Sequence, residues 1–232
     1  MPNPTRSLSG LMASLVHETS NPNDTFQFER MLLKRGFCTI AGTDEVGRGP
    51  LAGPVVAASV ILPPDCAHQH FCDSKQTTER QRYQLRDLLR EIGAVMGIGI
   101  VSPATIDKIN ILQASLLAMK RSIDELTRAQ MTPDFILVDG RHTLPVATPQ
   151  EALIKGDGRS ASIAAASIVA KIARDEIMAE LHQHFPQYNF AANKGYPTRE
   201  HRRNVAKHGP SPVHRLTFKG VKEFVSRADQ PR

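Results

Sequence analysis

The sequence lacks any apolar run that approaches the roughly 20 residues a helix needs to cross a bilayer. Its polar start, MPNPTRSLSG, also lacks the apolar core of a secretory signal. Cysteines are scarce: Cys38, Cys66 and Cys72 are too few and too irregularly spaced for a disulfide framework, which agrees with a reducing compartment. We therefore expect a cytoplasmic protein with free thiols and no membrane association.

Internal repeats are absent too, and the 232 residues suit one large domain with an ample hydrophobic core. The apolar fraction of 41% and the charged fraction of 22% are ordinary for globular proteins and argue against extensive disorder. Residues 1–25 are rich in Asn, Pro, Ser and Thr without sustained periodicity, so we predict a mobile N-terminal extension. The compact domain is expected to span residues 26–232.

Hydrophobic periodicity predicts a layered α/β domain in which strands and helices alternate. β-branched and small residues indicate strands at 37–45, 54–62, 94–101, 135–138 and 152–154, of which the first two form a hairpin. Apolar residues at helical spacing indicate helices at 26–36, 78–92, 103–126, 160–184 and 198–208. The 160–184 helix begins with small residues, which would permit close packing against a sheet.

Positive charge is concentrated near the C-terminus. Between Lys194 and Lys222, eight Lys and Arg residues accompany the single acid Glu200, so the +7 of this segment exceeds the +6 of the whole chain. Such clustering is what contact with phosphates needs, because each neutralised phosphate releases counterions and adds affinity. The alternative is a solvated basic tail.

Acidic residues follow or end three of the predicted strands. Asp44 and Glu45 end the first, and Asp139 and Asp157 come just after two later ones. Four acids at one edge of a sheet would repel one another, and binding hard cations such as Mg²⁺ would keep them charged. Taken one by one, the acids are equally compatible with turn dipeptides, Asp139-Gly140 and Asp157-Gly158, or with solvated surface positions.

A continuous stretch from Ala41 to Ala58, AGTDEVGRGPLAGPVVAA, closely resembles the signature of the type 2 ribonuclease H family. Further segments resemble the family in the same order, over about residues 28–222: Asp73–Lys75, Ile109–Gln113, Ile136–Gly140, Lys155–Asp157, Ser162–Asp175, Asn193–Thr198 and His208–Arg215. The resemblance implies a ribonuclease H-like fold, a five-stranded mixed sheet flanked by helices, with a helical basic C-terminal portion at about residues 185–225.

The resemblance also implies an active site. Asp44, Glu45, Asp139 and Asp157 occupy the four catalytic, metal-binding positions of the family, where two Mg²⁺ or Mn²⁺ ions are expected to bind with substrate. The family is an endoribonuclease that cuts the RNA strand of RNA–DNA hybrids and incises 5′ to single ribonucleotides in duplex DNA, leaving 3′-hydroxyl and 5′-phosphate ends. Both nucleic acids are therefore the expected partners, and we expect a monomer.

Substrate contacts are implied in the same way. The loop Gly47-Arg48-Gly49 matches the family's loop that recognises the ribose 2′-hydroxyl, and glycines let a backbone approach a sugar closely. Tyr196 matches the tyrosine that packs on the sugar after the RNA–DNA junction. Further backbone contacts are expected from a set of less specific positions: Lys75, Asn110, Ser160 and the basic region Arg199–Lys219.

Three segments depart from the family pattern. Gln76-Thr77-Thr78 stands where the family more often has a second lysine and a leucine. The extension of about 25 residues is too short for the substrate-binding domain of ribonuclease HIII, which favours the HII branch. The loop Cys66–Cys72 holds two Cys and two His, but ligands at every second residue cannot easily surround one zinc ion, so we expect an exposed loop.

Two other functions remain open at this point. A non-catalytic nucleic-acid binder would keep the basic surface, although the presence of all four acids argues against it. Another two-metal phosphohydrolase, such as an exonuclease or a phosphatase, would keep the acids; the glycine-arginine-glycine loop and Tyr196 argue against that one.

Overall fold

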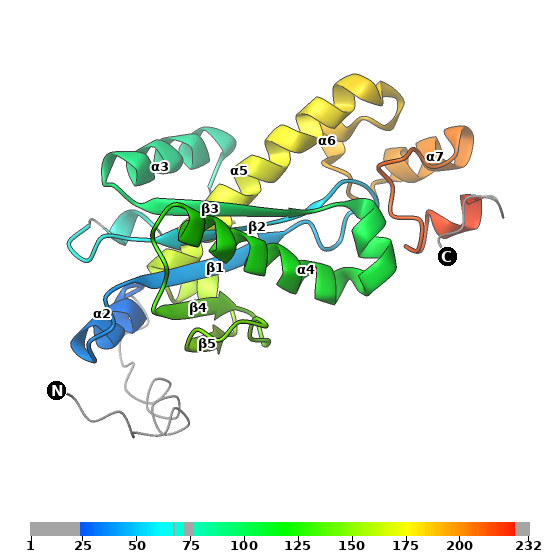
Figure 1. Ribbon diagram of the computed structural model, residues 1–232. Helices are drawn as coiled ribbons and strands as arrows, with labels where there is room; N and C mark the ends of the chain where they lie inside the picture. The colour runs from blue at the N-terminus through cyan, green and yellow to red at the C-terminus, as the bar shows by residue number, and fades with distance from the viewer. Residues whose placement is uncertain (1–23, 67, 72–76, 226–232) are drawn as a thin grey trace.

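The computed structural model describes residues 24–66, 68–71 and 77–225, and its centre is a five-stranded mixed sheet (Figure 1). The strands are β1 (Ile40–Val46), β2 (Val55–Ile61), β3 (Val95–Val101), β4 (Phe135–Asp139) and β5 (Gln150–Leu153). Their order across the sheet is β3-β2-β1-β4-β5. The pairs β1–β2 and β2–β3 are antiparallel, whereas β1–β4 and β4–β5 are parallel.

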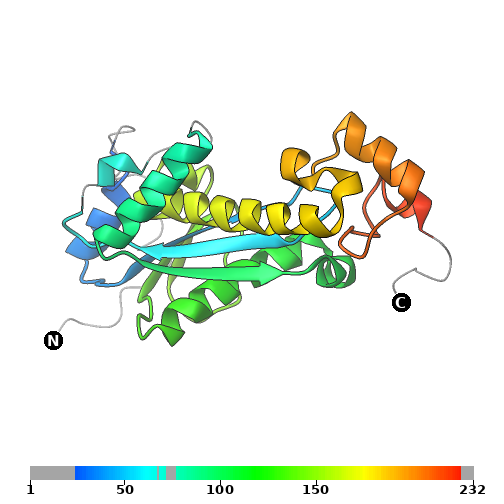
Figure 2. The ribbon, with the colours of Figure 1, turned by 90° about the horizontal axis from the view of Figure 1, so that it is seen from above.

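Helices cover both faces of the sheet. The α-helices are α2 (Gln27–Lys34), α3 (Glu79–Glu91), α4 (Pro103–Arg128), α5 (Ala161–His184), α6 (Phe190–Asn193) and α7 (Arg199–His208). Short 3-10 turns lie at His68–His70, Gly156–Gly158, Pro186–Tyr188 and Lys222–Phe224. Seen from above, α4 lies on one side of the strands and α5 on the other, and α6 and α7 extend from one end (Figure 2).

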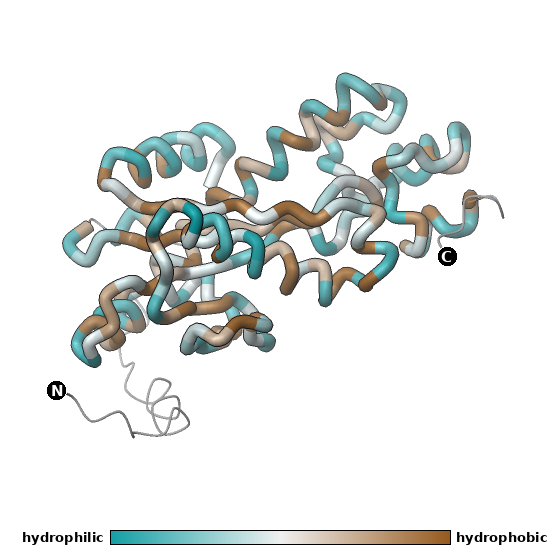
Figure 3. The backbone as a smooth tube through the Cα atoms, in the orientation of Figure 1, coloured by the Kyte–Doolittle hydropathy of each residue, from teal (hydrophilic) through white to brown (hydrophobic). Residues whose placement is uncertain are grey.

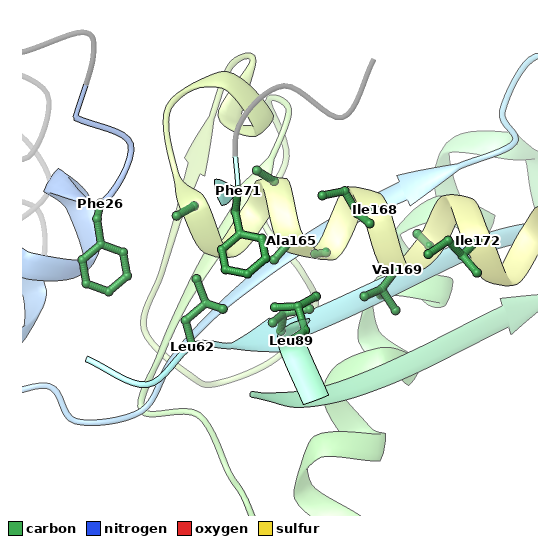
Figure 4. Close-up of a cluster of buried hydrophobic side chains, with 14 residues drawn as sticks. Phe26, Leu62, Phe71, Leu89, Ala165, Ile168, Val169 and Ile172 are labelled. Carbon is green, nitrogen blue, oxygen red and sulfur yellow. The ribbon is translucent and has the colours of Figure 1, made fainter. Parts of the chain in front are cut away.

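Two apolar cores follow from this layering, one on each face of the sheet. Hydrophobic residues concentrate along the central strands, whereas α7 is largely hydrophilic (Figure 3). On the α5 face, Ile168, Val169 and Ile172 lie near Leu89 and the central strands (Figure 4). Small buried residues of α5 allow a very close approach: a Cβ atom on Gly42 of β1 would lie 2.2 Å from the Ser162 carbonyl carbon.

The predicted elements are confirmed, and the differences have local causes. Helix α4 is kinked at Asn110, which has a φ of 65° and a ψ of 166°. The sequence did not predict this kink, because the apolar residues keep their helical spacing on both sides of it. Strand β5 begins at Gln150, whose buried side chain bonds the main chain of Leu144 at 2.6 and 3.0 Å, a polar start that sequence periodicity does not reveal. The helix α6 was missed because it has four residues.

The predicted N-terminal extension lies outside the described residues, except for Asp24 and Thr25. Asp24 is tied to the domain: its carboxylate pairs with Arg30, and it accepts a hydrogen bond from the Phe26 amide at 3.1 Å. The Thr25 carbonyl accepts from the Ala161 amide at 2.7 Å, at the start of α5. The chain is therefore attached to the domain from Asp24 onward.

Close packing of β3 against α4 yields a testable consequence. A Cβ atom on Gly99 would lie 2.0 Å from the Ala118 carbonyl oxygen, a main-chain atom that cannot move alone. We expect Gly99→Ala to lower the free energy of unfolding by roughly 1–3 kcal/mol, as overpacking does elsewhere. Urea unfolding of Gly158→Ala is the matched control, because no atom lies within 4 Å of its added methyl group. Equal losses in the two variants would refute the close-packing explanation.

Candidate active site

Four acidic side chains line one cleft of about 400 Å³. Asp44 and Glu45 belong to β1, and Asp139 is the last residue of the neighbouring parallel strand β4. Asp157 lies in the 3-10 turn at Gly156–Gly158, which follows β5. Parallel strands end at the same edge of a sheet, so the topology brings together acids that are far apart in the sequence. The sequence-based grouping of the four acids is therefore found in the structure.

Burial, and then mutual repulsion, shape the electrostatics of this cleft. Burial, followed by the charges of Glu45 and Asp139, raises the pKa of Asp44 well above its usual range. Burial also raises the pKa of Glu45, while Arg48, which donates to its carboxylate at 3.1 Å, works in the opposite direction. Asp139 accepts a hydrogen bond from the Gly156 amide at 2.6 Å, which fixes one carboxylate oxygen near the turn that contains Asp157. A bound cation would keep these groups ionised together.

The donor set fits a hard divalent cation, because all four side chains present carboxylate oxygens. Within residues 24–66, 68–71 and 77–225, no three His, Cys, Asp or Glu side chains are already gathered as ligands of one ion. Mg²⁺ is one such hard cation: it keeps several waters and binds through one or two carboxylates together with substrate phosphates.

Basic side chains that sequence reasoning missed also line the cleft. Arg82 of α3 and Lys171 of α5 lie there with Ser167 and Tyr196. Lys171 is held 2.7 Å from Asp175, and Arg82 is 3.7 Å from the same carboxylate. Their positions on two helices that meet only in the folded protein explain why no local motif reveals them.

The loop Gly47-Arg48-Gly49 lies beside Glu45 and Tyr196. Gly47 has a φ of +96°, and a Cβ atom there would lie 2.3 Å from the Arg174 side chain. A Cβ atom on Gly49 would lie 3.7 Å from the Tyr196 ring. The Tyr196 side chain is exposed, and its ring centroid is 6.0 Å from the Arg174 guanidinium carbon. The predicted junction-recognising groups are thus neighbours in space.

Two fully buried arginines hold this loop. Sequence reasoning gave Arg174 no role and placed Arg215 only within the basic region Arg199–Lys219, which was expected to contact the substrate backbone. Arg215 donates to the Gly47 and Arg48 carbonyls, at 2.5 and 3.0 Å, and to the Gly53 carbonyl. Arg174 of α5 donates to the carbonyls of Ala52, Pro54 and Lys194, at 3.0–3.2 Å. Together they connect the loop to α5 and to the segment before Tyr196. No local signal marks Arg174, because other charged residues of α5, Lys171, Asp175 and Glu176, stand beside it in the sequence.

The less specific candidates lie elsewhere. Lys75 is outside the described residues, as is Cys72 of the Cys/His loop. Asn110 is exposed at the α4 kink, where its side-chain oxygen accepts from the Leu112 and Gln113 amides at 3.0 and 3.1 Å. Ser160 is fully buried: it caps α5 and donates to the Glu29 carboxylate at 2.6 Å. The cleft lining contains neither, so their contact with substrate stays a prediction.

Comparison with known proteins identifies the family. The model of the family described as "Ribonuclease HII" matches residues 41–221. The chain belongs to the ribonuclease HII family. A ribonuclease HII of Desulfotalea psychrophila is 56% identical over 204 residues, covering 88% of this chain and 91% of the relative. A second, of Geotalea daltonii, is 47% identical over 203 residues, covering 88% and 93%.

Solved structures agree with the fold. The ribonuclease H2 of Pyrococcus horikoshii superposes with a TM-score of 0.65 at 25% identity, covering 81% of this chain and 97% of that one. A Bst ribonuclease HIII in complex with Mn²⁺ superposes with a TM-score of 0.66 at 18% identity, covering 81% and 69%, and shows the fold. The ribonuclease H-like fold expected for this ribonuclease HII is confirmed. Among the described residues, no helix is long and apolar enough to span a membrane.

Membership of the ribonuclease HII family makes the chain an endoribonuclease, a hydrolase that acts on the RNA of RNA–DNA hybrids. The enzyme class expected from the resemblance is therefore confirmed.

Replacing Arg215 tests whether the buried guanidinium group organises the loop. A lysine has no planar fork, so Arg215→Lys loses contacts to several carbonyls inside the protein. We expect the free energy of unfolding to fall by about 2–4 kcal/mol and hydrolysis of hybrid RNA to slow, as measured by urea unfolding and by a gel assay. The exposed Arg202 of α7 provides the control, and Arg202→Lys should change stability by less than about 0.5 kcal/mol. Equal stability of the two variants would contradict this role.

Proposed function

We propose that this ribonuclease HII incises duplex DNA on the 5′ side of an embedded ribonucleotide, in addition to cutting the RNA strand of hybrids, and leaves 3′-hydroxyl and 5′-phosphate ends. The observation that supports it is one cleft lined by the four acids and Tyr196, with the Gly47–Gly49 loop beside it. Hydrolytic groups and a surface suited to a ribose thus lie side by side.

Divalent cations supply the chemistry of hydrolysis in this proposal. Two Mg²⁺ or Mn²⁺ ions bound with substrate by Asp44, Glu45, Asp139 and Asp157 would lower the pKa of a water and stabilise charge on the leaving 3′ oxygen. The side chains orient these ions, and the Gly156 amide keeps Asp139 aligned, since it donates to that carboxylate at 2.6 Å.

Recognition of the ribonucleotide is the task of the loop and Tyr196. The Gly47 and Arg48 carbonyls are engaged by Arg215, so the loop is shaped before substrate arrives. Gly49 has no side chain, and a Cβ atom there would meet the exposed Tyr196 ring at 3.7 Å, so a glycine lets the backbone approach a sugar beside that ring. The 2′-hydroxyl is the group by which a protein distinguishes RNA from DNA at one position.

Phosphate contacts are assigned to the basic groups around the cleft. Arg82 and Lys171 lie beside the acids, held by Asp175, and would neutralise phosphates next to the cut. The exposed side chains of α7, including Arg202, Arg203 and Lys207, would contact the duplex further away.

A duplex labelled at one end, with a single ribonucleotide inside one strand, tests the proposal. We expect one cut 5′ to the ribonucleotide in Mg²⁺ or Mn²⁺ and none with a chelator. Asp139→Asn should slow it at least on the order of 100-fold, because metal stabilisation of the transition state is worth several kcal/mol. Asp124→Asn is the control and should cut normally, because Asp124 is a partly exposed acid of α4 that pairs with Lys120.

Each alternative gives a different gel. A ladder of products would indicate an exonuclease and overturn the proposal. Salt-sensitive binding without any cut under either metal would indicate a non-catalytic binder. Cutting that survives the chelator would refute the metal mechanism.

A further inference from the structure

Two buried histidines form a pair that the proposed chemistry does not use. His201 of α7 and His214 are almost completely inaccessible, and their Nε2 atoms are 3.1 Å apart. The rings of Tyr188 and Phe190 pack around them, with centroids 4.7–6.3 Å from the two imidazoles. The pair lies in the small apolar cluster between the C-terminal helices and Ala52.

Hydrogen bonds at the two ends of the pair determine where its protons lie. The Ser211 amide, which can only donate, donates to His214 Nδ1 at 2.9 Å, so the proton of His214 is on Nε2. At the other end His201 Nδ1 lies 2.9 Å from the Tyr196 carbonyl oxygen, which can only accept. His201 therefore donates from Nδ1 and accepts from His214 at Nε2. The outer hydrogen bonds of both histidines are thus compatible with one hydrogen bond between the rings, from His214 Nε2–H to His201 Nε2.

The charge state agrees with this arrangement. Burial, and next the charge of neighbouring His201, lowers the pKa of His214 to about 3. Burial also lowers the pKa of His201. Each imidazole is consequently neutral near pH 7 and has a single proton, as the directed chain of hydrogen bonds needs.

The chain of hydrogen bonds ends at the residue that faces the cleft. We propose that His201 and His214 form an imidazole relay that positions Tyr196 against the Gly47-Arg48-Gly49 loop, making both histidines positioning residues for ribonucleotide recognition. This inference rests on the recognition role proposed for Tyr196.

Further hydrogen bonds connect the segment around His214 to the Gly47-Arg48-Gly49 loop. Residue Arg215, next to His214, holds the Gly47 and Arg48 carbonyls. The Gly53 amide donates to Val213 and the Leu51 amide to Gly195, both at 2.8 Å. The segment around His214 therefore supports the loop through Arg215 and Tyr196 through His201.

Substitutions at His201 separate positioning from packing. Phenylalanine keeps a ring but has no donor for the Tyr196 carbonyl, whereas the amide of asparagine can occupy the place of Nδ1–H and keep that bond. We expect His201→Phe to lower kcat/KM for single-ribonucleotide incision on the order of 10-fold to 100-fold, the range seen for small misplacements. His201→Asn should recover part of this loss, because it keeps the contact with the Tyr196 carbonyl but removes the contact with His214. Incision is measured below the temperature at which either variant unfolds.

A double-mutant cycle with Tyr196→Ala distinguishes positioning of Tyr196 from a purely structural role of His201. If the relay acts through Tyr196, His201→Phe has little further effect in the Tyr196→Ala background. An equal loss with and without the tyrosine would overturn the relay, as would failure of His201→Asn to exceed His201→Phe.

NMR of the imidazole nitrogens in the wild-type protein tests the relay independently of catalysis. We expect the neutral Nδ1–H tautomer for His201 and the neutral Nε2–H tautomer for His214; the opposite tautomers, or a charged ring at pH 7, would refute the inference. If these tautomers are found but Tyr196→Ala incises like the wild type, the recognition role of Tyr196 fails instead, and with it the positioning function of the relay.

Discussion

The structure depends on two guanidinium groups that have no exposed surface. Arg174 comes from the long helix behind the sheet and Arg215 from the C-terminal segment, and each donates to three main-chain carbonyls. A buried cation is costly unless its donors are satisfied, and here the dipoles of carbonyl groups supply the compensation. These carbonyls belong to the turn after β1 and to the segment before Tyr196. The hydrogen bonds that compensate the buried guanidinium groups therefore also fix the shape of the cleft.

Much of this organisation could be predicted from the sequence. The strand-end positions of Asp44, Asp139 and Asp157, together with the family resemblance, indicated a shared acidic edge, and the parallel pairing of β1 with β4 provides it. The small-residue start of the helix after Ser160 indicated close packing, which Gly42 bears out, because a Cβ atom there would lie 2.2 Å from the Ser162 main chain. Such predictions succeed because strand alternation and helix periodicity are local properties of the chain.

The remainder required tertiary contacts. Arg215 was counted among the cations of a basic segment, yet its side chain is fully buried, and no local pattern distinguishes it from the exposed Arg202 of the same segment. Arg82 and Lys171 reach the acids from separate helices. Ser160 illustrates the reverse case: its place in a family motif suggested substrate contact, while in the fold its hydroxyl caps a helix and satisfies the buried Glu29.

The strand order has a consequence for how the protein acquires its active site. Asp44 and Glu45 lie on β1, whose antiparallel partner β2 is next in sequence, so that hairpin needs only a short loop. Asp139 joins them only when β4 pairs with β1 in parallel, after β2, β3 and α4 have been bridged, and closing so long a loop is slow. We therefore expect the repulsive carboxylates to meet late in folding, and a divalent ion that binds only the assembled cluster would favour that step by mass action. Assembly of the nuclease site and docking of the second half of the sheet are then one event.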